Sequence, residues 1–157
     1  MEDLIIRSAE DRDCERLSYL LQQICEFHVK GRPDVFKSGQ KYPLSELSTL
    51  IRDPERPVFV AELDGLVVGY AFCILKRRAN DPVLRDMLTV YVDDLCVDEN
   101  CRRGGVGRAL FEHVKAYARS IDAYNIDLNV WEFPGSAVDF YEKMGMKTER
   151  RYMELIL

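Results

Sequence analysis

A stretch rich in glycine and arginine has the composition of an anion-binding turn. Residues 102–108 read Arg-Arg-Gly-Gly-Val-Gly-Arg and lead directly into an apolar stripe with helical spacing. Glycine lets a ligand approach the backbone closely, and the first N–H groups of a helix, together with its dipole, favour negative charge. The candidate anion-binding residues are Arg102, Arg103, Gly104, Gly105, Val106, Gly107 and Arg108.

Two familiar phosphate-binding motifs are absent from this stretch. A P-loop requires Gly-x-x-x-x-Gly-Lys-Ser/Thr, and the dinucleotide fingerprint requires Gly-x-Gly-x-x-Gly. Here Gly105-x-Gly107 is followed by Leu110 and not by a third glycine. The spacing that is present is Arg-x-x-Gly-x-Gly, from Arg102 to Gly107. The alternative is a glycine-rich helix start with solvated arginines.

Two adjacent carboxylates, Asp93 and Asp94, interrupt a segment otherwise built of Leu, Thr, Val and Tyr. Carboxylates are costly to bury unless they are paired or functional. In a regular strand they point to opposite faces. Either residue is a candidate general base. The alternative is that one of them pairs with a nearby Arg or Lys and only holds structure.

The elements that must position these residues follow from the hydrophobic periodicity and the turn signals. The Asp64-Gly65 pair predicts a tight hairpin, because glycine accepts a positive φ cheaply. The predicted order is a strand at 4–7, helices ending at Gly31 and starting at Pro43, strands at 58–63, 66–75 and 87–97, a loop at 76–81, a helical stripe at 106–121, a strand at 126–131, a helix at 136–144 and a strand at 148–157. This order predicts an α+β (mixed α/β) domain whose central sheet is mostly antiparallel, with helices on both faces.

Length and composition narrow the function classes. The 157 residues predict one domain, residues 1–157. The net charge of −5 argues against nucleic acid as the main partner and is compatible with a cationic substrate. No apolar run approaches the roughly 20 residues of a membrane span, and no secretory signal is recognisable, so we expect a cytoplasmic protein with no membrane partner. Five scattered cysteines without a Cys-x-x-Cys pair predict free thiols and no metal site.

The Arg-x-x-Gly-x-Gly motif and the element order together resemble the GNAT superfamily of N-acetyltransferases, in which this motif binds the pyrophosphate of acyl-CoA. A second family feature is the segment Phe140-Tyr141-Glu142-Lys143-Met144-Gly145 at the end of a helix. The resemblance implies the GNAT fold, with splayed fourth and fifth strands. It also implies acetyl transfer from acetyl-CoA to a primary amine of a small molecule or peptide, by direct attack on the thioester. The alternative is a catalytically weak acyl-CoA-binding module that acts as a sensor or subunit.

The same resemblance assigns roles to individual residues. The backbone N–H groups of Leu95, Cys96 and Val97 would stabilise the oxyanion, with the pantetheine arm in the gap beside them. Tyr141 matches the general acid that protonates the leaving thiolate, and its alternative is a core aromatic.

The run from Val90 to Val97 resembles the corresponding strand of the spermidine/spermine-type (diamine) N-acetyltransferases. In those enzymes a glutamate at the position of Asp93 acts as the base, so Asp93 ranks ahead of Asp94. Many family members have an asparagine where this chain has Pro134, and its cofactor contact would pass to Ser136 or to the backbone.

The acceptor pocket of the family lies between the first two helices. That region would place Phe36, Asp34 and Tyr42 against the substrate, although loop packing is the alternative for each. Homodimers are common in such families, so a homodimer is possible here.

Overall fold

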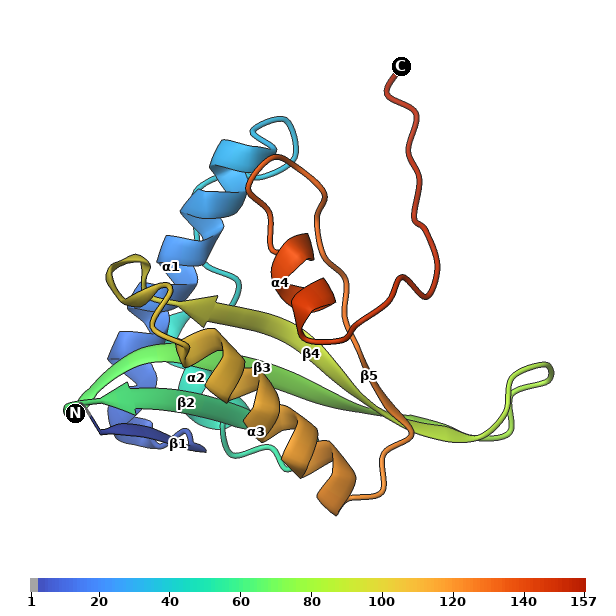
Figure 1. Cartoon of the computed structure of the whole chain (residues 1–157), viewed down its shortest axis with the longest axis horizontal. Helices are drawn as coiled ribbons and strands as arrows, with labels where there is room; N and C mark the ends of the chain where they lie inside the picture. The colour runs from blue at the N-terminus through green and yellow to red at the C-terminus, as the bar shows by residue number, and fades with distance from the viewer. Residues whose placement is uncertain (1–2) are drawn as a thin grey trace.

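Among residues 3–157, five strands form a single sheet in the order β1-β2-β3-β4-β5 (Figure 1). A computed structural model describes residues 3–157. The neighbouring strands are antiparallel except for β4 and β5, which are parallel. The predicted α+β fold with a mostly antiparallel sheet is therefore confirmed. The strands are β1 Leu4–Ser8, β2 Val58–Leu63, β3 Leu66–Arg78, β4 Met87–Val97 and β5 Asn125–Asp127.

Helices cover both faces of this sheet, as the sequence predicts (Figure 1). Helices α1 and α2 pack on one face and α3 packs on the other. Among residues 3–157, no helix is both long and apolar enough to cross a membrane. The helices are α1 Cys14–Gly31, α2 Leu44–Leu50, α3 Val106–Ser120 and α4 Val138–Lys143, with short 3₁₀ turns η1 Asp11–Asp13 and η2 Glu99–Cys101.

Alternate residues of β3 supply two separate hydrophobic cores. Tyr70 and Phe72 face α1 and α2, whereas Ala71 and Cys73 face α3. This is the period of two that a strand imposes when both of its faces are covered. The central strands β3 and β4 are therefore held on both sides, which gives the site a rigid base.

The β2–β3 hairpin closes through the predicted two-residue turn. Asp64 and Gly65 have φ values of 50° and 80°, as a turn that follows the strand twist requires. At its other end β3 extends to Arg78, which pairs with Met87 of β4. Residues 76–78 therefore belong to the strand and not to the predicted loop at 76–81. The paired strands form an arm that extends from the body (Figure 1).

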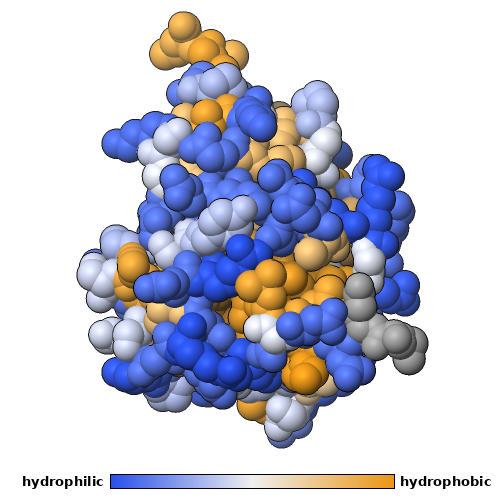
Figure 2. Space-filling model, turned by 90° about the vertical axis from the view of Figure 1, so that its left-hand side faces the viewer, coloured by the Kyte–Doolittle hydropathy of each residue, from blue (hydrophilic) through white to orange (hydrophobic). Residues whose placement is uncertain are grey.

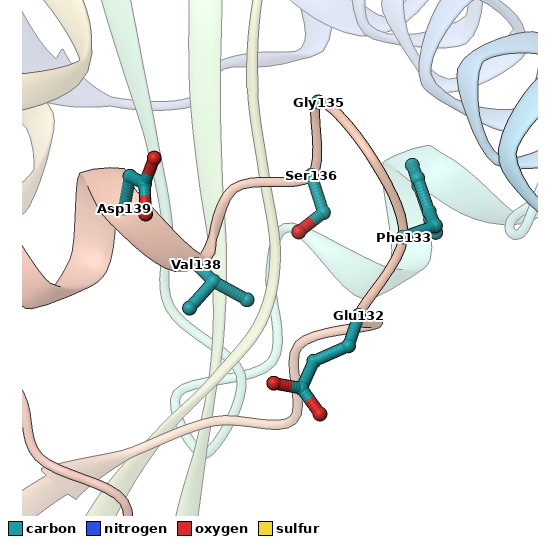
Figure 3. A pocket seen from close by; sticks show the side chains of 6 residues that line it. All are labelled: Glu132, Phe133, Gly135, Ser136, Val138 and Asp139. Atoms are coloured by element: carbon teal, nitrogen blue, oxygen red, sulfur yellow. The ribbon is translucent and has the colours of Figure 1, made fainter.

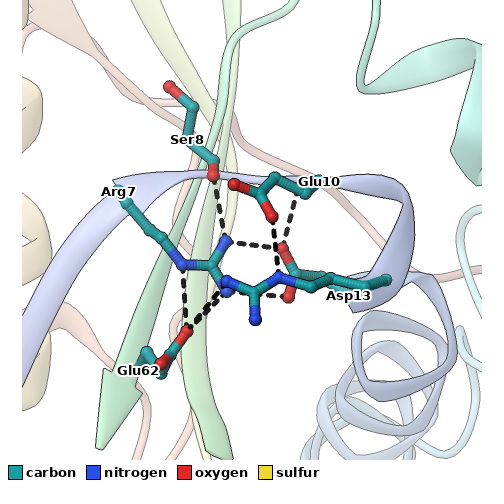
Figure 4. A network of polar contacts seen from close by, with 6 residues as sticks. Arg7, Ser8, Glu10, Asp13 and Glu62 are labelled. Atoms are coloured by element: carbon teal, nitrogen blue, oxygen red, sulfur yellow. Dashed lines mark hydrogen bonds and ion pairs between the residues drawn. The ribbon is translucent and has the colours of Figure 1, made fainter. Parts of the chain in front are cut away.

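An arginine-centred network ties the start of α1 to the edge of the sheet (Figure 4). The guanidinium of Arg7 donates to Asp13 at 2.8 Å and to Glu62 at 2.6 Å. Burial opposes the ionisation of Asp13, but hydrogen bonds from Arg7 and from the Glu10 amide outweigh it and lower the pKa of that carboxyl. The network is thus an ion-pair cluster that orients β1, β2 and η1.

Two predictions in the C-terminal part differ from the structure. The predicted strand at 126–131 is present only as Asn125–Asp127, because β4 and β5 diverge beyond that point and a strand needs a partner. The predicted strand at 148–157 is wrong for this chain, since these residues form no strand and are exposed. Figure 1 shows this segment leaving the body after α4.

Candidate active site

The sheet forks between β4 and β5. The two strands pair from Thr89–Asn125 to Tyr91–Asp127, and the Thr89 hydroxyl donates to the Asn125 side-chain oxygen at 2.7 Å at the base of the fork. Beyond Tyr91, β4 continues to Val97 while β5 ends. The predicted splay is therefore present, and it leaves one edge of β4 open.

The backbone N–H groups near the end of β4 alternate between β3 and this open edge. The amide of Asp98 donates to the carbonyl of Val68, at the start of β3, at 2.8 Å. Since successive amides of a strand point in opposite directions, the N–H of Val97 and that of Leu95 face the open edge, and the N–H of Cys96 faces β3. Of the three predicted donors, Leu95 and Val97 therefore have the geometry to serve a ligand in the fork.

The glycine-rich turn ends on the first residue of α3. Gly105 caps the helix with a φ of 81° and no side-chain hydrogen bond, so the first helical N–H groups keep their capacity to bind an anion. A Cβ at Gly105 would meet no atom within 4 Å, which shows open space beside the turn. Arg102, Arg103 and Arg108 are all exposed there. The turn has the donors, charge and room of a pyrophosphate site.

Helix α4 docks against the start of α3 through a glycine. A Cβ at Gly107 would lie 3.3 Å from the ring of Phe140 and 3.6 Å from Val97. This close approach places the neighbouring Tyr141 in the interior, where it is 9% exposed and packs near Phe111 at 6.2 Å between ring centroids. Burial, with a contribution from the charge of Asp94, raises the pKa of the Tyr141 hydroxyl.

A β-bulge in β4 changes the predicted orientation of the paired carboxylates. Phe72 lies opposite Asp94 and Cys73 lies opposite Val92, so Asp93 is the extra residue. The prediction that Asp93 and Asp94 point to opposite faces is wrong, because a bulge interrupts the alternation of side chains. Both lie on the α1/α2 side, Asp93 against Tyr42 and Asp94 beside Tyr70.

Asp93 is held by cationic and hydroxyl partners. Its carboxylate accepts from Lys41 Nζ at 3.0 Å and from the Tyr42 hydroxyl. Arg56 in turn donates to the Tyr42 hydroxyl oxygen at 2.7 Å. Asp93 therefore has a lysine partner, as expected from the alternative in which one of the two aspartates pairs with an Arg or Lys and only holds structure.

Asp94 has a different environment. Burial raises its pKa to about 6, with the charge of Lys41 opposing this shift and that of Asp93 adding to it. Within residues 3–157 no ion pair is made by its carboxylate. The hydroxyl of Tyr70, next to it, is buried without a hydrogen-bond partner. A carboxyl that titrates close to neutral pH is suited to proton transfer.

The remaining predicted residues lie in two places. Phe36 stacks on His28 at 5.0 Å and meets the edge of Trp131 at 5.1 Å, so it belongs to an aromatic group at the end of α1. Asp34 is exposed and pairs with Arg32 at 3.0 Å, so its carboxylate is engaged on the surface.

Ser136 lies in the loop before α4, beside an open depression (Figure 3). Its backbone N–H donates to the carbonyl of Phe133 at 3.0 Å. The hydroxyl of Ser136 points into the space that Glu132 and Val138 border. The depression is lined by Glu132, Phe133, Gly135, Ser136, Val138 and Asp139.

Sequence reasoning missed Lys41, Arg56 and Tyr70. The two cations lie in loops far from β4 in sequence, and nothing in their spacing points to Asp93. Tyr70 has the pattern of an ordinary core residue of β3. In the part of the chain that the structure describes, no group of three or more His, Cys, Asp or Glu side chains could hold a metal ion.

A forked mixed sheet beside a glycine-rich helix start is the arrangement expected of the GNAT superfamily. The sequence matches the acetyltransferase (GNAT) family over residues 17–146, and the chain belongs to this family.

Two relatives and a solved structure extend this comparison. An N-alpha-acetyltransferase of Sulfurisphaera tokodaii is 30% identical over 113 residues, which are 69% of this chain and 66% of the relative. The peptidyl-lysine N-acetyltransferase YjaB of Salmonella typhimurium is 33% identical over 110 residues, 68% of this chain and 63% of the relative. The chain thus spans just under two thirds of the length of each. A tetramutant of the BH1408 protein from Bacillus halodurans is 33% identical, with a TM-score of 0.91 over 98% of this chain and 99% of that one.

Proposed function

We propose that this protein transfers an acetyl group from acetyl-CoA to a primary amine of a small molecule or peptide, by direct attack of the amine on the thioester. The observation that carries the proposal is the open edge of β4, which runs from the Asp93–Asp94 bulge to the anion-binding turn before α3. Membership of the GNAT family and the N-acetyltransferase names of two relatives support it.

The residues along this edge fit acetyl-CoA. The turn from Arg102 to Arg108 offers free helical N–H groups, exposed guanidinium groups and open space for the pyrophosphate. The carbonyl groups of Leu95 and Val97 face the fork on the same edge as their N–H groups, and the N–H groups of the pantetheine arm would donate to them. Ser136 would contact the arm from the loop before α4. Acetyl-CoA supplies the activated acetyl group, and the proposal includes no metal.

We assign the general base to Asp94, which reverses the order expected from sequence. An alkylammonium group has a pKa of about 10.4 and cannot attack until it loses a proton. Asp93 is already bound by Lys41 and Tyr42. Asp94, with its pKa raised to about 6, is ionised at neutral pH and accepts a proton more readily than an ordinary carboxylate, directly or through water.

We assign stabilisation of the oxyanion to the open edge of β4 and protonation of the leaving thiolate to α4. The N–H groups of Leu95 and Val97 would stabilise the oxyanion, at about 3 kcal/mol of barrier for each aimed donor. Tyr141 would protonate the leaving thiolate. Because burial raises its pKa, the Tyr141 hydroxyl carries its proton at neutral pH and has it to donate to the sulfur as the C–S bond breaks.

The acceptor would enter from the α1/α2 side, where both carboxylates of the bulge lie. Tyr42 is the best placed of the predicted substrate residues, because it contacts Asp93 and stacks on Phe72 at 5.4 Å. Phe36 would line a more distant, aromatic part of the pocket. The name of one relative, a peptidyl-lysine N-acetyltransferase, supports a peptide as the acceptor, and that of another, a glucosamine 6-phosphate N-acetyltransferase, supports a small amine.

We extend the proposal to the setting of the enzyme. Residues 1–157 would form one N-acetyltransferase domain, and the two cores that share β3 support this. A cytoplasmic location fits five cysteines that are all free. A homodimer is compatible with this arrangement.

The first test measures thermal stability with acetyl-CoA, CoA, ATP and NAD in parallel, followed by thiol release with a panel of amines. A ligand at about 100 times its dissociation constant stabilises the fold by about 2.7 kcal/mol. We expect stabilisation by acetyl-CoA and CoA alone, and thiol release with at least one amine. No stabilisation by either form of CoA would contradict the proposal at its centre.

A further inference from the structure

One primary amine of the chain itself lies at the carboxylates of the bulge. Lys41 Nζ donates to the Asp93 carboxylate and to the Asp93 carbonyl oxygen, each at 3.0 Å. The surface shown in Figure 2 is mostly hydrophilic, so an exposed charged side chain is ordinary on this protein. The position of Lys41 is what distinguishes it, because a primary amine next to the proposed base Asp94 has the chemistry of the acceptor.

The residues on both sides of Lys41 are anchored. The side-chain amide of Gln40 donates to the Ser18 hydroxyl and to the Tyr42 carbonyl, both at 2.9 Å. The ring of Tyr42 stacks on Phe72 at 5.4 Å between centroids. The flexible four-carbon stem of Lys41 therefore starts from a fixed point beside β4.

The amine of Lys41 is close to the place where the thioester would bind. The Asp93 carbonyl that accepts from Lys41 lies two residues before Leu95, whose N–H group faces the open edge. Two residues of a strand span about 7 Å, a distance that rotations within the lysine stem cover. An amine held this close to an acyl group reacts as if its concentration were far above that of a free amine.

Other lysines have partners elsewhere in the structure. Lys115 pairs with Glu112 on α3 at 3.2 Å. Lys76 lies over the ring of Tyr91, 3.6 Å from its centroid, at the closed base of the fork where β5 pairs with β4. Among residues 3–157, Lys41 is the one lysine that forms an ion pair with a carboxylate of the bulge.

We propose that Lys41 is a self-acetylation site, whose Nζ attacks acetyl-CoA bound to the same chain when no amine acceptor is present. This inference rests on the proposed function. The ammonium group loses one proton to solvent through Asp94 before the attack and a second proton as the amide forms. The bond from Nζ to the acetyl carbon forms, the C–S bond breaks, and the thiolate takes a proton from Tyr141, which the second proton restores. The products are acetyl-lysine, CoA and one proton.

Acetylation of Lys41 changes the charge around the proposed base. The positive charge of Lys41 lowers the pKa of Asp94, against the effects of burial and of Asp93. Its removal raises that pKa, so less of Asp94 is ionised at neutral pH. In the described part of the chain the charged side chains that act on Asp94 are Lys41 and Asp93. Its other titratable neighbours have pKa values raised by burial and are uncharged at neutral pH, namely Tyr70, Cys96 and Tyr141.

Self-acetylation therefore lowers turnover after a period without an amine acceptor. The test incubates the native protein with acetyl-CoA alone and maps acetyl groups by peptide mass spectrometry. A parallel sample measures thiol release with the panel of amines. We expect one acetyl group per chain, on Lys41, at a first-order rate that is independent of protein concentration. A saturating amine acceptor should protect Lys41, and the acetylated protein should need a higher pH than the untreated protein to reach half of its maximal kcat/KM.

Lys37 is the matched control, because it is an exposed lysine of the same loop. It should be acetylated at least about tenfold more slowly than Lys41, since it lacks the proximity effect. Asp94→Asn should slow the acetylation of Lys41 at least about tenfold, since it removes the base.

The two samples separate the failure of this inference from that of the proposed function. Thiol release to an added amine without acetyl-Lys41 overturns the inference and leaves the proposed function standing. No stabilisation by CoA and no thiol release overturn both. Equal acetylation of Lys37 and Lys41, or an unchanged rate in Asp94→Asn, means that acetyl-CoA modifies exposed amines without the site and overturns the inference. A rate proportional to protein concentration overturns transfer within one chain, and an unchanged pH dependence after acetylation overturns the effect on turnover.

Discussion

Where β4 meets the turn before α3, the proposed acetyl-CoA site is built from backbone N–H groups, glycines and exposed arginines. At the bulge of the same strand, the proposed acid–base site is built from partly buried side chains whose charges influence one another. The first site depends on φ angles and free space, such as the φ of 81° at Gly105. The second depends on which side chain holds which proton. Changes at the turn should therefore alter binding, and changes at the bulge should alter turnover.

The largest effect should come from the unpaired carboxylate of the bulge. We expect Asp94→Asn to lower kcat/KM about 10²–10³-fold, the lower part of the usual range for a general base, with no change in the dissociation constant of acetyl-CoA. Asp93→Asn is the matched control and should cost less than about tenfold, because Asp93 is bound by Lys41. In the native protein kcat/KM should rise with pH through about 6, as Asp94 loses its proton. Equal losses in the two variants would remove the distinction between them.

The same substitution should stabilise the fold. Burial raises the pKa of Asp94 from 3.8 to about 6, so between these values the unfolded state ionises first and the free energy of unfolding falls as pH rises. At about 1.4 kcal/mol per pKa unit, the ionised group costs about 3 kcal/mol above pH 6. Asp94→Asn should match the native protein near pH 4 and exceed it by about 2–3 kcal/mol at pH 7. Denaturant unfolding at both pH values measures this, and an equal difference at both would contradict the assigned environment.

The hydroxyl of Tyr141 tests the part of the site that α4 supplies. Tyr141→Phe removes the hydroxyl and keeps the ring that packs near Phe111. We expect kcat to fall about 10²-fold, the low end of acid–base effects, while acetyl-CoA still binds. Single-turnover thiol release would measure the chemical step. An unchanged rate would exclude Tyr141 as the acid and leave it as a core aromatic.

The smallest effect should come from the backbone site. Gly105→Val forces a β-branched residue to a positive φ, which costs about 1–2 kcal/mol, and should weaken acetyl-CoA binding about tenfold as the turn reshapes. Gly65→Val is a matched control, because Gly65 has a φ of 80° and equally open surroundings in the β2–β3 turn. It should lower stability without changing the dissociation constant. Loss of turnover at unchanged affinity in Gly105→Val would break the contrast between the two sites.

Local sequence patterns predicted the elements whose conformation depends on residues adjacent in sequence. The Asp64-Gly65 turn, the bounds of β4 and the glycine cap of α3 follow from residues adjacent in sequence. The strand expected at 148–157 depended on a partner, and its alternating pattern could not show whether its own chain supplies one. Strand β5 is shorter than predicted for a similar reason, because the residues after Asp127 do not pair with β4.

The sequence makes Asp93 and Asp94 candidate bases, and its alternative is that one of them pairs with an Arg or Lys and only holds structure. It could not reveal the bulge, because the register shift depends on how β3 faces β4. Lys41 and Arg56 reach the bulge only through tertiary folding. The sequence therefore could not show that they give Asp93 a different environment from that of Asp94.

The bulge also bears on how this gene can change. Deletion of one codon between those for Val92 and Leu95 would restore the regular pleat, and the remaining carboxylate would no longer have a neighbour on the same face. A deletion of equal size at the tip of the β3–β4 arm, around Val83, would only shorten an exposed turn. Insertions and deletions should therefore accumulate in that arm during evolution and be rejected at the bulge.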